Sequence, residues 1–362
     1  MADFLPEPHF SHAQSPRIGV LLINLGTPKA PTSSALRPYL REFLSDRRVI
    51  EIPRLLWSVI LNGFILTTRP AKSAKKYTSI WLPQGSPLAV HTQRQTEQLA
   101  QRFSATLPNV VVDYAMRYGQ PAVETVIQRM RAAGVTQFLC VPLYPQYAAS
   151  SSATALDAVF RTLMQLRSMP DVRTLRHFHD DAGYIAALAA KVQAHWAVQG
   201  RGDKLVMSFH GLPRRSLDLG DPYYCECHKT GRLLAEALGL TEDQYVVCFQ
   251  SRFGRAAWLQ PYTSEVLAAL GRAGASIDVL CPGFVADCLE TLEEIALEGK
   301  ETFHLAGGQR FAYIPCLNDD AAWVDALADL CQRHLAGWET AATAPAELAA
   351  RAERAKQRGA AQ

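Results

Sequence analysis

Short apolar runs alternate with longer helix-like stretches along most of this chain, and this alternation constrains the fold more than any other feature. Apolar runs of roughly four to eight residues are typical of strands that are buried on both faces of a sheet. When such strands alternate with helices, they predict parallel sheets with helices on both sides. The expected strands fall into two sets, at 18–25, 110–115, 138–143 and a weaker 174–178, and then at 205–209, 245–249, 277–280 and 311–315. We therefore predict an α/β fold of two similar flavodoxin-like or Rossmann-like domains, each a four-stranded parallel sheet flanked by helices.

Composition and charge narrow the class of protein. The 362 residues suffice for two domains of ordinary size, and 48% hydrophobic with 20% charged residues describes a globular protein with an ample core. A net charge of only +3, without a block of lysine and arginine, argues against a nucleic-acid partner. The start of the chain lacks the features of a secretory signal, and no apolar run is long enough to span a bilayer. Because the cysteines also lie mostly in apolar strand-like runs, we predict a cytoplasmic protein.

One histidine stands where a buried strand is expected to end. In the segment 206–213 (VMSFHGLP), His210 follows the apolar run, and Gly211 and Pro213 begin a turn. The carboxyl ends of strands in open α/β sheets are the places where ligand crevices form. An imidazole there can take up a proton or bind a metal near neutral pH. Considered alone, this segment is equally compatible with a turn histidine that has no chemical role.

A row of acidic residues follows another expected strand. The segment 281–295 (CPGFVADCLETLEEI) predicts a turn and then a helix that begins near Val285 or Ala286. On that helix Asp287, Glu290 and Glu294 would share one face, about one turn apart. The row could be a solvated acidic face, but its position at a strand end, like that of His210, favours a site for a hard cation or for proton transfer.

Three common families of strand-end site are excluded by missing motifs. No G-x-G-x-x-G sequence follows an expected strand, and the chain has no G-K-[ST] of a phosphate-binding loop. It also has no G-x-S-x-G of a nucleophile elbow. The strand-end loops therefore serve something other than nucleotide phosphates or a serine nucleophile.

Taken together with further short motifs in order, these segments resemble the ferrochelatase family over residues 17–335. The additional motifs are NLGTP at 24–28, LRPYLREFLSD at 36–46, RPAKS at 69–73, GSPL at 85–88, MRYG at 116–119, PLYPQY at 142–147, GDPY at 220–223, QSR at 250–252 and WLQP at 258–261. The resemblance implies a lyase of heme biosynthesis that inserts ferrous iron into protoporphyrin IX to form protoheme. It also implies two domains that face each other across a cleft.

The resemblance assigns roles to individual residues. His210 would accept pyrrole protons or hold iron, and Glu290, supported by Asp287 and Glu294, would deliver the metal or carry protons away. The residues expected to bind the porphyrin are Asn24, Leu25, Arg69, Lys72, Arg117, Tyr118, Ser208 and Trp258. Within this set Arg69 and Lys72 would pair with propionates, and Arg117 with Tyr118 would lie opposite His210. A surface or structural role remains the alternative for the two cations, for the Arg117–Tyr118 pair and for Trp258.

An apolar stretch at 55–66 (LLWSVILNGFIL) has two interpretations. It could be an ordinary buried helix. The resemblance favours an apolar lip over the cleft, at about 53–72, which could also rest on the inner membrane as a peripheral contact.

The chain departs from the family pattern at its cysteines. Many members have histidine two residues before the central glutamate, where this chain has Cys288, so a proton relay through that position is in doubt. No cysteine follows Cys331, and Ala148 and Ala149 follow the PLYPQY motif, so we expect the cluster-free bacterial type without an iron–sulfur cluster. The group Cys225-Glu-Cys227-His228 does not have the spacing of a zinc or iron–sulfur site. Iron is therefore expected as a substrate and not as a resident cofactor.

The expected organisation is an N-terminal domain at 17–185, a C-terminal domain at 186–320, a helix at 321–338 that packs back, and a tail at 339–362. Three other functions remain open. The chain could be a chelatase for another tetrapyrrole, with coproporphyrin and iron or with cobalt, or a carrier that binds a tetrapyrrole without inserting metal. A two-lobed periplasmic-type binding protein is disfavoured because no signal segment is recognisable.

Overall fold

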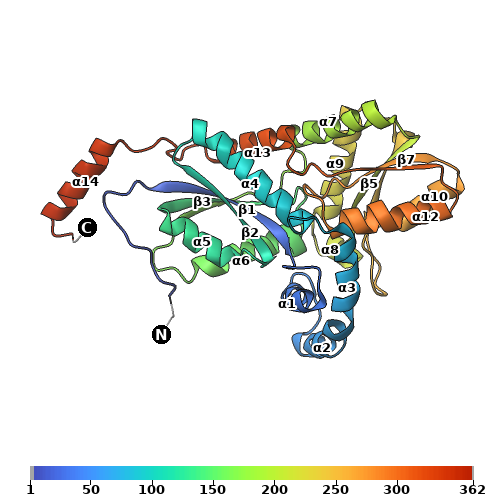
Figure 1. Cartoon of the computed structure of the whole chain (residues 1–362), viewed down its shortest axis with the longest axis horizontal. Coiled ribbons are helices and arrows are strands. Elements are labelled where there is room, and N and C mark those ends of the chain that lie inside the picture. Colours follow the sequence, from blue (N-terminus) through green and yellow to red (C-terminus); the bar gives the residue numbers. More distant parts are fainter. Residues whose placement is uncertain (1–3, 361–362) are drawn as a thin grey trace.

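Two four-stranded parallel sheets form the core of the computed structural model, which describes residues 4–360 (Figure 1). The first sheet has the order β2-β1-β3-β4 and the second has the order β6-β5-β7-β8, so the same topology occurs twice. The strands are β1 (Arg17–Thr27), β2 (Val110–Gly119), β3 (Val135–Pro142), β4 (Asp171–Thr174), β5 (Lys204–His210), β6 (Tyr245–Gln250), β7 (Ser276–Leu280) and β8 (Arg310–Ile314). The predicted fold class is confirmed.

The apolar runs form strands because helices cover both faces of each sheet. Along β1, alternate side chains enter two different clusters, Val20 and Leu22 in one and Leu21 and Ile23 in the other. The first cluster includes side chains of α4 (Pro87–Thr106), α7 (Ala182–Gln199), α9 (Tyr223–Ala237) and α13 (Ala321–His334). The second includes α5 (Val123–Ala132) and α6 (Thr154–Leu163), and α10 (Thr263–Arg272) and α12 (Lys300–Leu305) cover the second sheet.

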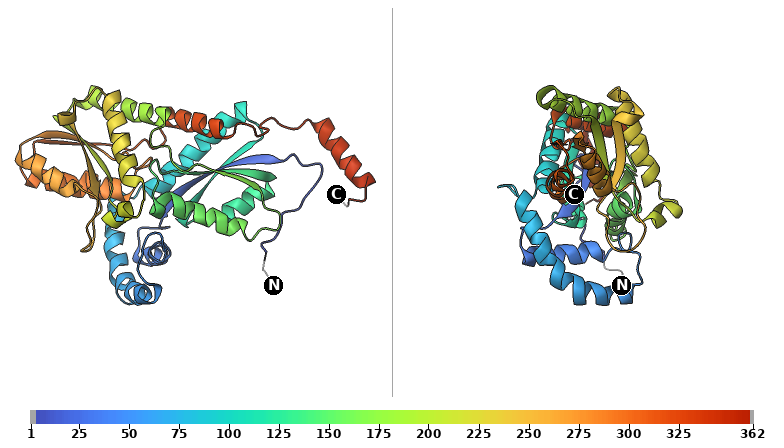
Figure 2. Two further views of the ribbon diagram at one scale, coloured as in Figure 1. Left: turned by 180° about the vertical axis from the view of Figure 1, so that it is seen from behind. Right: turned by 90° about the vertical axis from the view of Figure 1, so that its right-hand side faces the viewer.

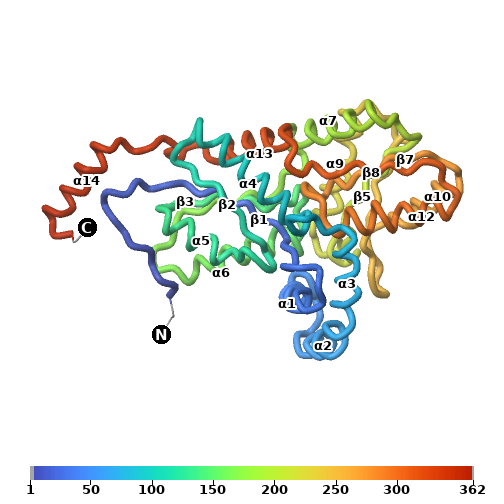
Figure 3. The backbone as a smooth tube through the Cα atoms, in the orientation of Figure 1, coloured from blue at the N-terminus to red at the C-terminus, as the bar shows by residue number. Residues whose placement is uncertain are grey.

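The two halves share one hydrophobic cluster and are joined by a continuous helix. The cluster that contains Val20 of β1 also contains Met207 of β5. Helix α7 spans the boundary predicted between residues 185 and 186, and it lies beside α13 along one edge of the molecule (Figure 3). Arg102 of α4 pairs with Asp325 of α13 at 2.5 Å, so the last helix of the second half contacts the first half.

A layer of helices projects from the first sheet below β1 (Figure 2). It consists of α1 (Ser33–Leu44), α2 (Arg54–Ile60), the π-helix η1 (Leu61–Ile65) and α3 (Leu66–Ile80). The helix α14 (Pro345–Gln357), in the stretch predicted to be a tail, lies away from both sheets beside the N-terminal segment. The short elements are η2 (Ala149–Ala153), α8 (Arg214–Asp218), η3 (Glu242–Gln244), α11 (Leu289–Thr291) and the π-helix η4 (Leu292–Gly299). Within residues 4–360, no helix combines the length and the apolar character needed to cross a membrane.

One predicted strand was misplaced. The weak run at 174–178 is not a strand, because β4 occupies Asp171–Thr174 and pairs with β3 from Gln137 to Cys140. The apolar residue that suggested a strand, Phe178, instead packs against the rings of Tyr184 and Trp323, which also contact each other. An edge strand needs few apolar side chains, so the apolar pattern gave the wrong position.

Candidate active site

His210 ends β5, and the local backbone fixes the orientation of its ring. Its Nδ1 lies 2.7 Å from the carbonyl oxygen of Gly211, and because a carbonyl only accepts, Nδ1 must carry the hydrogen. In the neutral ring Nε2 therefore has the free lone pair. Gly211 is required here, because a Cβ would lie 2.5 Å from the carbonyl oxygen of Gln250 on the neighbouring strand. The sequence thus presents one imidazole nitrogen at the end of the central strand.

The helix that carries the acidic residues begins later than predicted. It starts at Leu289 and not near Val285 or Ala286, and it continues from Leu292 as the π-helix η4. The preceding backbone is held by Asn318, which donates its N–H to the Val285 carbonyl at 2.8 Å. The Asn318 side-chain oxygen accepts from the N–H of Asp287, also at 2.8 Å. These bonds keep residues 285–287 out of the helix.

Asp287 is consequently not part of an acidic helix face. It is buried, and its carboxylate accepts hydrogen bonds from Tyr313 Oη at 2.5 Å, Asn318 Nδ2 at 2.6 Å and Thr291 Oγ1 at 3.0 Å. The backbone N–H of Cys316 adds a longer bond at 3.4 Å. The prediction that Asp287 shares a helix face with Glu290 and Glu294 is wrong, because Asp287 precedes the helix and is held by Tyr313 of β8 and by Asn318 on the loop after β8.

Glu294 is fixed by a serine that the sequence did not single out. Its two carboxylate oxygens accept from the backbone N–H and the hydroxyl of Ser251, both at 2.6 Å. Ser251 has φ +64°, a left-handed backbone conformation that residues other than glycine rarely adopt. Such strain is often found at functional sites. The sequence offered one indication of this role. Ser251 directly follows the end of β6, just as Gly211 directly follows the end of β5.

Electrostatic effects place Glu294 beside both Glu290 and His210. Burial raises the pKa of Glu294 above the ordinary value for glutamate. Hydrogen bonds from Ser251 and the neighbouring His210 oppose that rise, whereas the charge of Glu290 adds to it. Gln250, the register partner of His210, donates to the Glu290 carbonyl, and the next residue, Ser251, holds the Glu294 carboxylate. The structure therefore brings together His210, Glu290 and Glu294, three of the four residues predicted to be catalytic.

Gln250 of β6 links His210 to Glu290. It pairs with His210 in the β5–β6 register, and its Nε2 donates to the Glu290 carbonyl at 2.6 Å. Its side-chain oxygen accepts from Ser208 Oγ at 2.7 Å, and Ser208 also contacts Thr263 at 2.8 Å. Ser208, predicted to contact substrate, is fully buried, and its hydroxyl orients the Gln250 side chain through this hydrogen bond.

The end of β1 packs against the segment that leads to Glu290. Asn24 is buried, and its Nδ2 donates to Thr92 Oγ1 at 3.0 Å, so its amide is already engaged. Leu25 packs against Ala286 and Cys288. Burial raises the pKa of Tyr39 and Tyr77 in the projecting helices, and the nearby charge of Glu290 adds to both shifts. Glu290 therefore lies where the two halves meet.

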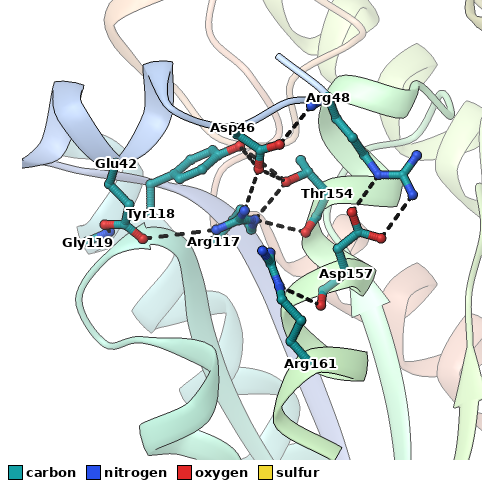
Figure 4. Close-up of polar contacts among 9 residues, drawn as sticks. All are labelled: Glu42, Asp46, Arg48, Arg117, Tyr118, Gly119, Thr154, Asp157 and Arg161. Atoms are coloured by element: carbon teal, nitrogen blue, oxygen red, sulfur yellow. Dashed lines mark hydrogen bonds and ion pairs between the residues drawn. The ribbon is translucent and has the colours of Figure 1, made fainter. Parts of the chain in front are cut away.

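Arg117 and Tyr118 form a brace around Asp46 (Figure 4). Tyr118 Oη donates to Asp46 at 2.9 Å, and Arg117 pairs with the same carboxylate. Arg117 Nε also donates to the Thr154 carbonyl at 2.8 Å. Although burial opposes it, bonds from Thr154, the Arg48 backbone and Tyr118 hold the pKa of Asp46 below its usual value. Both side chains tie β2 to the turn after α1 and to α6. Their predicted position opposite His210 stays a prediction.

The remaining predicted residues divide into a buried aromatic and two exposed cations. Trp258 is buried, with its ring 4.9 Å from that of Phe253, and it lies against the Gly211 turn. Arg69 and Lys72 are exposed on α3, and neither forms an ion pair within residues 4–360. Trp258 therefore supports the turn that presents His210, whereas the two cations are free to meet an anion.

The apolar segment 55–66, predicted to be either a lip or a buried helix, contains both exposed and buried residues. Leu55 and Val59 of α2 expose 88% and 67% of their surface, and Phe64 of η1 is also exposed. In contrast, Leu61 is buried and Trp57 donates its indole N–H to the Leu44 carbonyl at 2.6 Å. An apolar surface of this kind on a monomer commonly marks a binding surface.

Comparison with solved structures places the fold in a known class. The chain resembles SirB from Bacillus subtilis with Fe³⁺ (TM-score 0.55, 13% identity, covering 89% of this chain and 97% of that chain). It also resembles the sirohydrochlorin chelatase SirB from Bacillus subtilis subspecies spizizenii in complex with cobalt (TM-score 0.52, 10% identity, covering 90% and 98%). At these identities the likeness concerns the fold, and the class is the two-domain α/β fold of these chelatases.

Sequence comparison then identifies the family. The family model described as Ferrochelatase matches residues 17–335. Curated relatives named ferrochelatase include one from Chromobacterium violaceum, 65% identical over 340 residues (93% of each chain). Another, from Azoarcus sp., is 57% identical over 360 residues, covering 99% of this chain and 98% of the relative. The chain belongs to the ferrochelatase family.

Proposed function

We propose that this chain is a lyase of heme biosynthesis that inserts ferrous iron into protoporphyrin IX, with His210, Glu290 and Glu294 as the reacting groups. The observation that carries the proposal is the linkage of His210 to two glutamates: its register partner Gln250 holds the Glu290 backbone, and Ser251 holds the Glu294 carboxylate. An imidazole with carboxylates is a ligand set that suits Fe²⁺ and can also move protons. The iron is a substrate of this reaction.

The chemistry requires the removal of two pyrrole protons as iron enters the ring. A planar porphyrin hides its nitrogen lone pairs, so binding energy that bends the ring lowers the barrier to insertion. His210 Nε2, left free by the bond from Nδ1 to Gly211, has the lone pair needed to accept a proton or to hold iron. Glu290 and Glu294 supply the negative charge that attracts Fe²⁺ and receives the released protons. The hydrogen bonds of Asp287 to Tyr313, Asn318 and Thr291 hold the start of the helical segment that carries both glutamates.

The pKa of Glu294 predicts how metal binding depends on pH. Because burial raises this pKa, the carboxyl becomes neutral at a higher pH than an exposed glutamate does. Divalent-metal affinity should therefore be present above the raised pKa and be lost as pH falls through it. Folding stability has the opposite sign, since the protonated form is favoured in the folded chain and its contribution is lost as pH rises through that pKa. In a metal titration at several pH values, Glu294→Gln should move the acidic limb to lower pH, and an unmoved limb would contradict this role.

The exposed residues of α2 and η1 form an apolar lip, which consists of Leu55, Leu56, Val59 and Phe64. We propose that this lip borders the porphyrin site and makes peripheral contact with the inner membrane, where an apolar macrocycle partitions. Arg69 and Lys72 follow on α3, and as exposed cations they suit the propionates at the edge of the macrocycle. Cytoplasmic location with this peripheral contact is part of the proposal.

Charged substitutions on the lip should affect binding without affecting the fold. The double variant Leu55→Glu with Val59→Glu should raise KM for porphyrin several-fold and reduce sedimentation with anionic vesicles. Its free energy of unfolding should change by no more than about 0.5 kcal/mol, because both side chains are exposed. Leu305→Glu, at an equally exposed leucine on α12, is the control and should change neither measurement. If the lip variant instead fails to fold, the segment belongs to the core.

The substrate is tested by incubating the protein anaerobically with Fe²⁺ and each porphyrin while following the Soret band. Protoporphyrin IX should be converted well above the protein-free background. Conversion of coproporphyrin but not of protoporphyrin IX would identify a different chelatase, and tight porphyrin binding without conversion would identify a carrier. We propose that no iron–sulfur cluster takes part, since alanines and not a cysteine follow the PLYPQY motif, and the group Cys225-Glu-Cys227-His228 lacks the spacing of a cluster site. The protein purified anaerobically should therefore be colourless.

A further inference from the structure

Two histidines of the first half and a glutamate of the second half converge where the halves meet. His177 and His179 lie on the loop that follows β4 of the first sheet, and Glu226 lies in the first turn of α9, which packs on the second sheet (Figure 1). Within residues 4–360, neither histidine is hydrogen-bonded to His210, Glu290 or Glu294. The three residues have no part in the chemistry proposed above.

The distances are those of a metal-ligand set. His177 Nδ1 lies 2.7 Å from one carboxylate oxygen of Glu226, and His179 Nδ1 lies 3.4 Å from the other. The three ligand atoms lie within 4.8 Å of one another. Ligands at about 2.0–2.2 Å from a tetrahedral ion are separated by roughly 3.4 Å, so the three atoms need only small rotations to surround one ion.

Burial leaves one of these atoms without a partner. The side chains of His179 and Glu226 are only 6% and 8% exposed. Nδ1 of His179 is buried and has no hydrogen-bond partner within residues 4–360. A buried polar atom without a partner costs free energy, and a bound ion would remove that cost. Burial also lowers the pKa of His179, although Glu226 and Asp180 oppose this shift.

The surroundings orient the carboxylate and provide access. The backbone N–H of Tyr147 donates to Glu226 at 2.7 Å, which fixes the carboxylate. The His177 side chain is 36% exposed, so an ion can enter from solvent. Asp180 offers a fourth ligand, because its Oδ1 lies 3.8 Å from His179 Nδ1 while its other oxygen pairs with Lys229 at 2.5 Å.

We propose that His177, His179 and Glu226 bind a divalent transition-metal ion of the Zn²⁺ type, which joins the loop after β4 to α9. Two imidazole nitrogens with one carboxylate oxygen suit Zn²⁺ and its neighbours, whereas Mg²⁺ and Ca²⁺ prefer oxygen ligands alone. Because the ligands come from both halves, the bound ion stabilises their contact. This proposal does not depend on the insertion reaction.

The test uses Zn²⁺ and the full chain with His210→Ala and Glu290→Gln, so that the candidate insertion site cannot contribute. After removal of metal, equilibrium dialysis should show one Zn²⁺ bound per chain, and Zn²⁺ should raise the melting temperature. Adding His177→Gln or Glu226→Gln should weaken binding at least tenfold and abolish the rise in melting temperature. His91→Gln is the matched control, because His91 Nδ1 also contacts a carboxylate, that of Asp319 at 2.6 Å, but no second histidine. It should bind Zn²⁺ as the parent does.

Two results would overturn the site. One is the absence of bound Zn²⁺ in the parent chain, and the other is equal binding by the His177→Gln variant. Because His177 is partly exposed, its replacement should leave the metal-free melting temperature unchanged, so this variant decides the question even if Glu226→Gln fails to fold. Co²⁺ provides a second readout, since its tetrahedral complex should give strong visible absorption that His177→Gln loses.

Discussion

Replacement of His210 by alanine should abolish iron insertion while porphyrin affinity stays near normal. The ring is only half-buried at the end of β5, and its one hydrogen bond goes to the adjacent Gly211 carbonyl, so its loss removes little packing. What it does remove is Nε2, the atom assigned to accept a proton or hold iron. The rate of Soret conversion measures turnover, and quenching of porphyrin fluorescence measures binding.

The control for this variant is another histidine in a similar local arrangement. His304 is exposed, and its Nδ1 lies 3.0 Å from the Gly308 carbonyl oxygen, yet it is on α12 and is not in contact with Glu290 or Glu294. His304→Ala should turn over at the parent rate. Near-parental turnover in His210→Ala would show that His210 is a turn histidine without a chemical role.

Asp287→Ala should lower the free energy of unfolding by about 3 kcal/mol or more, a far larger loss than the removal of an exposed ion pair causes. The substitution leaves donors from Tyr313, Asn318 and Thr291 without their buried acceptor. Urea unfolding measures the change, and Asp157→Ala is the control, since its pair with Arg48 is exposed and contributes no more than about 1 kcal/mol. If Asp287→Ala leaves the free energy of unfolding unchanged but abolishes iron insertion, Asp287 has the catalytic role predicted from the sequence.

The central strands could be predicted from the sequence because they are apolar throughout. Both faces of β1 and β5 are covered, so their runs stand out from the amphipathic helices around them. The edge strand β4 could not be placed in this way, because its residues Asp171–Thr174 are polar or half-exposed. The duplicated strand order also could not be read, since it depends on pairing between distant segments.

Site residues that directly follow an apolar strand could be predicted from the sequence. Features that depend on contacts with residues far along the chain could not. His210 was found because a histidine between an apolar run and a glycine is a local signal. The late start of the helix depends on Asn318, far along the chain, and its π geometry has no local signature. The contact of Arg117 with Asp46 could not be predicted for the same reason, because the two residues are 71 positions apart. The family resemblance named candidate residues, but it did not give the hydrogen-bond partners that the structure shows for them.

The most direct test of the central claim is a single-turnover measurement with Glu290→Gln. Protoporphyrin IX is bound first, so that binding and chemistry are separated, and Fe²⁺ is then added anaerobically while the Soret band is followed. Glutamine keeps the shape of the side chain but removes its charge, so insertion should slow by about 10²-fold or more at equal bound porphyrin. Glu298→Gln, on the π-helix η4 that follows Glu290 but in an exposed pair with Lys76, should insert iron at the parent rate. Equal rates in Glu290→Gln and the parent would contradict the assignment of this site.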